Sequence, residues 1–378
     1  MRPPAGRLVE LILIGTLACE AQQPSTPPEA SARTTPAPAP APAPSAGNAP
    51  ATGSQTTAPL PPESATPDDP LAPPAPETLT QFFAGEQDAY LDFDKHYVKS
   101  NESRHDVWFP YIDGIGGAYV GVGADQNYTL IARARSEWVF LIDIDSRGGQ
   151  THLAYRALLR KHERVEDFLA NFEEDGESAA LETIDAAYAD LDEAERKRIR
   201  RGFQAARRTL QRHLSMVAAR SRDDSPTSWL SDPEAYEWMR RLYLADRVRI
   251  MPGDLTGSSS VKTIGRVCES MGLPVGVLYL SNAEEYFKYF KGDYRSNVAA
   301  LPTGEGSVVL RTLYGEDWEH ADSLWNYQVQ DLADFAARLG DPKLRSRNAM
   351  IKDARSEGAF AVDTGVKGVS LIGDVKRR

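Results

Sequence analysis

The stretch Asp113–Arg147 decides the fold and reads DGIGGAYVGVGADQNYTLIARARSEWVFLIDIDSR. Within it, Ala118–Val122 is a short, apolar, β-prone run that ends in the glycine turn Gly121-Val122-Gly123. A helix-compatible segment follows, with Asn127 as the expected N-cap, and then the almost continuous β-branched and aromatic run Trp138–Ile144. This order predicts a strand, a glycine turn, a helix and a second strand, the layout of the first βαβ unit of a ligand-binding α/β sheet.

Further strands and helices alternate along the rest of the chain. Strands are expected at Val248–Met251, Val275–Leu280 and Ser307–Leu313, and helices at Ser260–Met271 and Asp322–Leu339. A charged helical insertion is expected over residues 163–227, and Val366–Ile372 is expected as a last edge strand. The sequence therefore predicts an α/β fold with a Rossmann-like, doubly wound, mostly parallel sheet and a helical insertion.

The first 78 residues differ from the rest in composition. Residues 1–18 place two arginines and a short apolar run before Cys19, which is typical of a bacterial lipoprotein signal cleaved ahead of a lipidated cysteine. Residues 19–78 are rich in Pro, Ala, Ser and Thr and hold too few large apolar residues to fold, so a disordered tether is expected. The predicted organisation is signal peptide, tether, an α/β domain over 79–340 and a C-terminal extension over 341–378.

This organisation predicts an exported protein, anchored to the membrane through a lipidated Cys19 and facing the periplasm or the outer envelope. The alternative is an incidental apolar start that carries no anchor. The second cysteine, Cys268, lies in an apolar helical stretch and is expected to be a buried side chain.

Composition excludes several functions. The formal net charge of −11 disfavours unspecific nucleic-acid binding, so no nucleic-acid partner is expected. The six histidines show no metal-ligand spacing with each other or with the cysteines, so no metal site is predicted. Neither a Gly-x-Ser-x-Gly elbow nor a Walker loop occurs, and no catalytic group is identified.

The glycine turn departs from the dinucleotide-binding pattern. Gln126 stands where that pattern has a third glycine, and Asp125 lies where a pyrophosphate would meet the helix N-terminus. S-adenosylmethionine carries no phosphate and fits this loop better, with its ribose held by an acid at the end of the second strand. One departure is that Tyr119 occupies the position where methyltransferase patterns usually have a carboxylate.

A small-molecule site is expected where the carboxyl ends of the strands meet, since ligands of open α/β sheets bind there. Only one of Asp143 and Asp145 is expected to face it, because alternate strand residues point in opposite directions. Tight-turn and helix-capping roles are the alternatives for the glycines and for Asp254 and Asn282. The predicted cofactor-binding residues are Gly121, Gly123, Asp125, Gln126, Asn127, Asp143, Asp145, Asp254, Ser281 and Asn282.

The region from about Leu79 to Tyr314 resembles an uncharacterised bacterial family with a Rossmann-like, class I methyltransferase-type fold. The segments that carry this resemblance are GAYVGVGADQNYTLIA (117–132), FLIDID (140–145), HLAYRALL (152–159), LSDPEAYEWMRRLY (230–243), GDLTG (253–257), YLSNAEEYF (279–287), NVAALP (297–302) and SVVLR (307–311). The family has no established substrate, so the resemblance bears on the fold more than on activity. It implies an S-adenosylmethionine-dependent methyltransferase-like protein with an unknown acceptor; the alternative is a non-catalytic envelope lipoprotein that uses the domain as a binding module.

Overall fold

The computed structural model describes residues 69–91 and 93–378, and these residues fall in one compact unit. Cys19, the expected signal peptide and most of the expected tether lie outside the described residues. Among the described residues, no helix is both long enough and apolar enough to cross a membrane.

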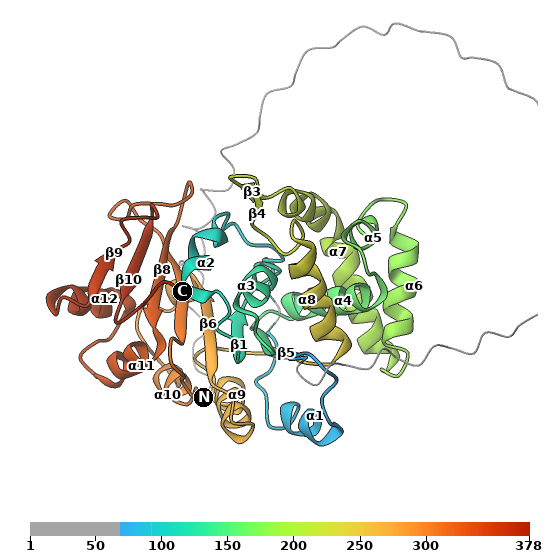
Figure 1. Ribbon diagram of the computed structural model, residues 1–378. Coiled ribbons are helices and arrows are strands. Elements are labelled where there is room, and N and C mark those ends of the chain that lie inside the picture. The colour runs from blue at the N-terminus through green and yellow to red at the C-terminus, as the bar shows by residue number, and fades with distance from the viewer. Residues whose placement is uncertain (1–68, 92) are drawn as a thin grey trace, which may run out of the picture. The chain divides into compact units, whose positions relative to one another are not determined.

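An eight-stranded sheet organises the unit, with the strand order β5-β2-β1-β6-β7-β8-β10-β9 (Figure 1). The first five of these strands run parallel, and β8 is antiparallel to β7. Beyond it, β10 is parallel to β8, and β9 closes the edge antiparallel to β10. The strands are β1 Ala118–Val122, β2 Trp138–Asp143, β5 Val248–Pro252, β6 Val275–Ser281, β7 Val308–Leu313, β8 Asn326–Asp331, β9 Phe360–Val362 and β10 Val369–Ile372.

This topology confirms the predicted Rossmann-like, doubly wound α/β fold. The parallel strands occur in the order third, second, first, fourth, fifth along the chain, so the direction of winding reverses between β1 and β6. Crevices at such reversal points, beyond the carboxyl ends of the strands, are where open α/β sheets bind ligands. Strands β1 and β2 are buried on both faces, as their continuous apolar sequences predict.

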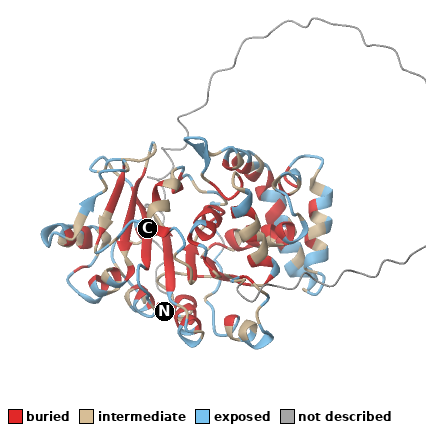
Figure 2. Ribbon diagram, viewed as in Figure 1, coloured by how far each residue is buried: buried red, intermediate tan, exposed pale blue. Residues whose placement is uncertain are grey.

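Two layers of helices cover the two faces of the sheet (Figures 1 and 2). One apolar core lies between the sheet and α1, α9, α10 and α11, and a larger one lies on the side of α2, α3, α4, α7 and α8. The helices are α1 Pro76–Phe82, α2 Phe109–Ile112, α3 Gln126–Ala134, α4 Ser146–Lys161, α8 Pro233–Leu244, α9 Ser260–Ser270, α10 Tyr294–Ala299, α11 Leu332–Gly340 and α12 Arg347–Ser356, with short 3-10 turns η1 His105–Trp108 and η2 Ala283–Tyr286.

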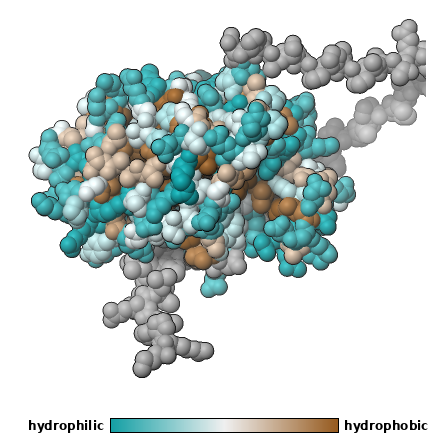
Figure 3. Space-filling view, turned by 90° about the horizontal axis from the view of Figure 1, so that it is seen from below, coloured by the Kyte–Doolittle hydropathy of each residue, from teal (hydrophilic) through white to brown (hydrophobic). Residues whose placement is uncertain are grey.

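The expected helical insertion contains α5 Val165–Ala170, α6 Glu177–Ala187 and α7 Glu193–Ala218, followed by a small hairpin of β3 Ser221–Arg222 and β4 Ser225–Pro226. The long helix α7 packs along α4 through its apolar side. On the face of the molecule that Figure 3 shows, hydrophobic residues gather in several small patches between hydrophilic ones.

Three segments differ from the expectation. The stretch Asp322–Leu339 is a strand followed by a helix, β8 and α11, and not one helix. The residues after 340 hold α12, β9 and β10, so they complete the sheet and are not an appendage to it; β10 is an inner strand and β9 the edge. Ordered packing also starts before residue 79, because Leu71 is buried and Asp69 pairs with Arg241.

Candidate functional site

The predicted site residues meet at the carboxyl edge of the sheet, around the point where the winding reverses. Val122 lies opposite Ile142 in the parallel ladder, so Gly123 and Asp143 follow side by side. Ser281 ends the neighbouring strand on the other side, and Asp254 follows β5 two places away. The strand–turn–helix order therefore delivers these backbone segments to one edge, but their side chains serve different purposes.

Both turn glycines are required by the fold itself. A Cβ on Gly121 would lie 2.0 Å from Oδ1 of Asn127, and Gly123 has a φ of +85°, which side chains with a Cβ rarely adopt. The carbonyl of Gly123 accepts a hydrogen bond of 2.7 Å from Nε2 of His152. The tight-turn explanation is thus sufficient for both glycines, and neither one is by itself a sign of a ligand.

Asn127 does not cap the helix. Its side chain is fully buried, and its Nδ2 donates to the carbonyls of Val122 and Ala124 at 2.9 and 2.7 Å. Its Oδ1 accepts from the hydroxyl of Tyr119 at 2.8 Å. Asn127 therefore holds the turn closed, and the residue that precedes the helix is Asp125, which makes no side-chain capping bond.

Asp125 turns away from the strand ends and into the helical layer. Its carboxylate accepts hydrogen bonds from Nε2 of His213 at 2.8 Å and from Nε1 of Trp229 at 3.4 Å. Burial raises the pKa of Asp125, but the charge and hydrogen bond of His213 outweigh burial, so the pKa lies below its ordinary value. Asp125 is thus a paired structural acid, and its charge is not presented to a ligand at the turn.

Gln126 is the turn residue with spare hydrogen-bonding capacity. Its Nε2 donates to the hydroxyl of Tyr279 at 3.3 Å and would lie 2.9 Å from a Cβ on Gly123, so the amide folds over the turn. Its Oε1 is buried and has no partner within the described part of the chain. In the same part of the chain, no hydrogen bond engages the N–H groups of Ala124 and Asp125, which precede the first turn of α3.

The two acids at the end of β2 have different partners. Strand alternation does not explain this, because residues two apart in a strand point to the same face. They diverge because β2 ends at Asp143, whereas Asp145 is already the N-cap of α4. Asp145 caps α4 by accepting from the N–H of Arg147 at 2.9 Å, and its carboxylate lies 2.8 Å from Nδ1 of His96. Asp143 accepts from the N–H of Asp145 at 2.9 Å and has no ion-pair partner among the described residues. Burial raises the pKa of Asp143 to about 6. Keeping this carboxylate charged near neutral pH therefore lowers the stability of the folded protein.

We expect Asp143→Asn to stabilise the protein at pH 7.5 by about 1–3 kcal/mol and to have little effect at pH 4. A pKa raised from 3.8 to about 6 means that the folded state binds the proton more tightly, so stability falls as pH rises through this window. Asparagine keeps an oxygen for the N–H of Asp145 but carries no charge. Urea unfolding of both proteins at the two pH values measures the difference; an equal effect at both would contradict the buried-charge explanation.

A segment that precedes the sheet lies across this edge. We call residues 88–97 the strap, leaving out Asp92, which is not described. Leu91 pairs with the chain after β2, since its N–H donates to the carbonyl of Ile144 and its carbonyl accepts from the N–H of Ser146. The carboxylate of Asp88 accepts from three backbone N–H groups at 3.1–3.3 Å: that of Asp254 after β5, and those of Ser259 and Ser260 at the start of α9. The helix α1 ends at Phe82, and the aromatic and apolar residues Tyr90, Leu91 and Phe93 belong to the extended strap that follows it.

Two exposed tyrosines, Tyr90 and Tyr286, lie close to Asp143, and Tyr97 lies close to Tyr286. Tyr90 comes from the strap, Tyr97 from its end and Tyr286 from the turn after β6, and all three rings are at least one-third exposed. Burial raises the pKa of Tyr90, and the nearby carboxylate of Asp143 raises it further. The hydroxyl of Tyr90 would lie 2.2 Å from a Cβ on Gly149, so only glycine fits beneath it. An acid bordered by aromatic rings suits a ligand that combines hydroxyl or cationic groups with a flat ring.

Ser281 contributes to a buried network that the sequence did not reveal. Glu102 is almost fully buried, and its two oxygens accept from Ser281, Thr312, Tyr279 and His105 at 2.6–3.0 Å. Ser281 has a φ of +51° next to a register shift between β6 and β7, which directs its hydroxyl to Glu102. This network fastens the chain before η1 to the carboxyl ends of β6 and β7.

The remaining two predicted residues stay at the surface of the same edge. Oδ1 of Asp254 accepts from the N–H and hydroxyl of Thr256, which is a turn contact and not a helix cap. Asn282 donates to Glu285 at 3.3 Å, so the capping-box spacing brings these two side chains together, but the side chain of Asn282 makes no capping hydrogen bond to η2.

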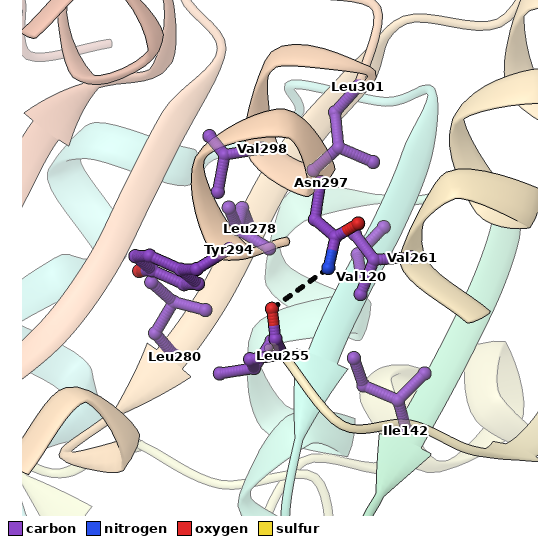
Figure 4. A pocket seen from close by; sticks show the side chains of 10 residues that line it. All are labelled: Val120, Ile142, Leu255, Val261, Leu278, Leu280, Tyr294, Asn297, Val298 and Leu301. Carbon is purple, nitrogen blue, oxygen red and sulfur yellow. Dashed lines mark hydrogen bonds between the residues drawn. The ribbon is translucent and has the colours of Figure 1, made fainter. Parts of the chain in front are cut away.

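A cavity near this edge is not a ligand pocket. It lies between the sheet and helices α9 and α10, is lined mainly by apolar side chains, and has a volume of about 10 Å³ (Figure 4). Such a space holds one water molecule at most. Its Asn297 is already engaged with the carbonyl of Leu255. Among the described residues, no cluster of three or more His, Cys, Asp or Glu side chains is arranged to hold a metal ion.

The fold and this edge together define a Rossmann-like α/β domain with a helical insertion and an acid at the end of its second strand. Residues 97–373 match the family described as Domain of unknown function (DUF7790), and the chain belongs to this family. No curated protein matches the chain. The match agrees with the resemblance to an uncharacterised family. It does not identify the chain as a methyltransferase.

Proposed function

We propose that this domain binds S-adenosylmethionine or a related nucleoside at the carboxyl edge of β1 and β2, as a methyltransferase-like protein. The observation that carries the proposal is Asp143, an acid without an ion-pair partner among the described residues. Burial of this acid costs stability, and it lies beside the glycine turn. Perturbed acids of this kind are concentrated at functional sites. Its carboxylate is suited to accept hydrogen bonds from ribose hydroxyls, while the tyrosines around it offer surfaces for an adenine ring or a sulfonium.

The choice between S-adenosylmethionine and a dinucleotide rests on Gln126. Because Asp125 is paired with His213 and turned away, its charge no longer argues against a pyrophosphate. Gln126, however, fills the space over Gly123 where a pyrophosphate needs close approach to the backbone. The unengaged N–H groups before α3 and Oε1 of Gln126 suit the carboxylate and the ammonium of a methionine moiety.

The strap limits how a ligand can reach Asp143. It covers the ends of β2 and β5 and holds Asp145 through His96, so a ligand at Asp143 enters between the strap and the turn that carries Tyr286, or displaces the strap. Once bound, a transferase of this class needs mainly alignment of the acceptor with the activated methyl group, and little acid–base chemistry.

A second candidate is a non-catalytic binding module. Glu102, Asp125 and Asp145 are engaged in structural hydrogen bonds, so of these four acids Asp143 is the one open to a ligand. A site with one open acid suits binding more than catalysis. A binding module also fits the proposed export and lipidation at Cys19, since an intracellular cofactor is not expected outside the cytoplasmic membrane. Labelling with palmitate, with a Cys19→Ala control, tests the anchor separately.

Calorimetric titration of the full chain tests the proposed ligand. We expect saturable binding of S-adenosylmethionine or S-adenosylhomocysteine and a ten- to hundredfold loss of affinity in Asp143→Asn, the effect of losing a charged hydrogen bond of about 1.5–3 kcal/mol. Glu182→Gln, which removes the same charge from the exposed surface of α6, is the matched control. Binding of NAD alone overturns the choice of ligand, and no binding of any nucleotide at millimolar concentration favours the binding module.

A further inference from the structure

The exposed face of α7 is strongly basic although the chain as a whole is acidic. This helix spans 26 residues and carries eight basic and two acidic residues, a net charge of +6 in a chain of −11. Its other face is firmly held, because Ile199, Phe203, Leu210 and Leu214 are buried in the core that α7 shares with α4. The basic face is therefore displayed on a rigid support.

Some of these cations serve the fold, but most of the exposed ones do not. Arg200 pairs with Asp185, and Arg207 pairs with Glu177 and donates to two backbone carbonyls, so both tie α7 to the preceding helix or loop. Four other arginines of α7 are exposed and have no acidic partner within the described part of the chain. They are Arg198, Arg201, Arg208 and Arg212.

These four arginines form one row along the helix, which we call the arginine row. Their spacing of three, seven and four residues keeps them on one side of an α-helix, over a length of about 21 Å. On that side Ala205 lies between them, Ala194 precedes Arg198 and Ala219 follows Arg212, and Met216 continues the row with 59% of its surface exposed. Both acids of α7 lie in its first turn, outside the row.

We propose that the arginine row docks the domain on a membrane surface that contains anionic phospholipids. Each cation close to such a surface adds to the attraction, while the negative charge elsewhere on the chain directs this face and no other toward it. A straight row on a rigid helix, with the small residue Ala205 between the cations and an exposed methionine at one end, matches a flat interface with an apolar layer beneath. Arg147 donates to the backbone carbonyl of Arg201, so docking places the candidate site edge near the membrane.

Vesicle sedimentation of the full chain tests this proposal, with Cys19→Ala present in every protein so that no lipid anchor contributes. The vesicles contain phosphatidylcholine alone, or phosphatidylcholine with 30 mol% phosphatidylglycerol. We expect binding to the anionic vesicles only, a loss of at least tenfold when the four arginines of the row are changed to Gln, and weakening at high salt. Met216→Ser is expected to reduce binding severalfold without any change in charge.

The control variant changes four exposed cations of the C-terminal part to Gln, namely Lys343, Arg345, Lys352 and Lys367. An equal loss in this control, or no binding of the parent protein to anionic vesicles, overturns the proposal. Saturable binding to duplex DNA that depends on the row, without vesicle binding, overturns the choice of partner. The salt series and Met216→Ser keep the test informative if the fourfold variant does not fold.

Discussion

Glu102→Ala is expected to lower the free energy of unfolding by about 3–5 kcal/mol, the range found when one member of a buried charged pair is removed. The substitution deletes an acceptor for four donors at once, from Ser281, Thr312, Tyr279 and His105. Those donors stay buried, and each one left unsatisfied costs free energy. Because the same network fastens the chain before η1 to the sheet, that segment should also become accessible to protease.

Urea unfolding at pH 7 measures the loss, and Glu86→Ala is the matched control, since Glu86 is exposed in the preceding segment. Burial raises the pKa of Glu102, but the hydrogen bonds and charge of its partners, His105 first, outweigh burial and hold the pKa below its ordinary value of 4.5. A carboxyl with a lowered pKa stabilises the fold above 4.5 and loses this contribution as pH falls further. The difference between wild type and Glu102→Ala should therefore shrink below pH 4.5; a difference that grows there would contradict the assignment.

The first βαβ unit could be predicted from the sequence because its signals are local. The apolar runs Ala118–Val122 and Trp138–Ile144 match β1 and β2 within one residue, and the glycines between them mark the turn. Periodicity and turn residues act over a few positions, so they are visible without knowledge of the fold. The acids at the end of β2 followed from the same layout. Their divergence did not follow from strand alternation, since residues two apart point to the same face; it arises because β2 ends at Asp143 and Asp145 caps α4.

The direction of individual side chains could not be predicted, since it depends on partners far along the chain. Asp125 finds His213 in the insertion, 88 residues later, and Glu102 finds Thr312 across 210 residues. Nothing in the local sequence distinguishes Glu102 from an ordinary surface acid. The apolar spacing in Asp322–Leu339 fits a helix, but β7 offers a free edge, and Asn326–Asp331 pairs with it as a strand. Tertiary pairing there overrides the local periodicity.

Arg311→Met is expected to destabilise the protein by a similar 3–5 kcal/mol, through a second buried pair on the other side of β7. Arg311 and Glu284 are both fully buried, and Nη1 of Arg311 lies 2.9 Å from Oε2 of Glu284. Arg311 also donates to Gln330 and stacks its guanidinium 4.4 Å from the ring centre of Phe335. Methionine fills much of the volume but leaves Glu284 as an uncompensated buried charge.

The double variant Glu284→Gln with Arg311→Met separates the charge effect from the packing effect. If the isolated carboxylate causes the loss, the double variant should be about 1–3 kcal/mol more stable than Arg311→Met. The introduced amide is neutral, and it can still accept the hydrogen bond from Tyr294, the second partner of Glu284. Urea unfolding of the wild type, both single variants and the double variant measures this coupling. Strictly additive losses would show that Arg311 acts through its packing on Phe335 and its bond to Gln330. A positive coupling would identify the pair as the charged link that joins β7 to the turn bearing Tyr286, one of the tyrosines around Asp143.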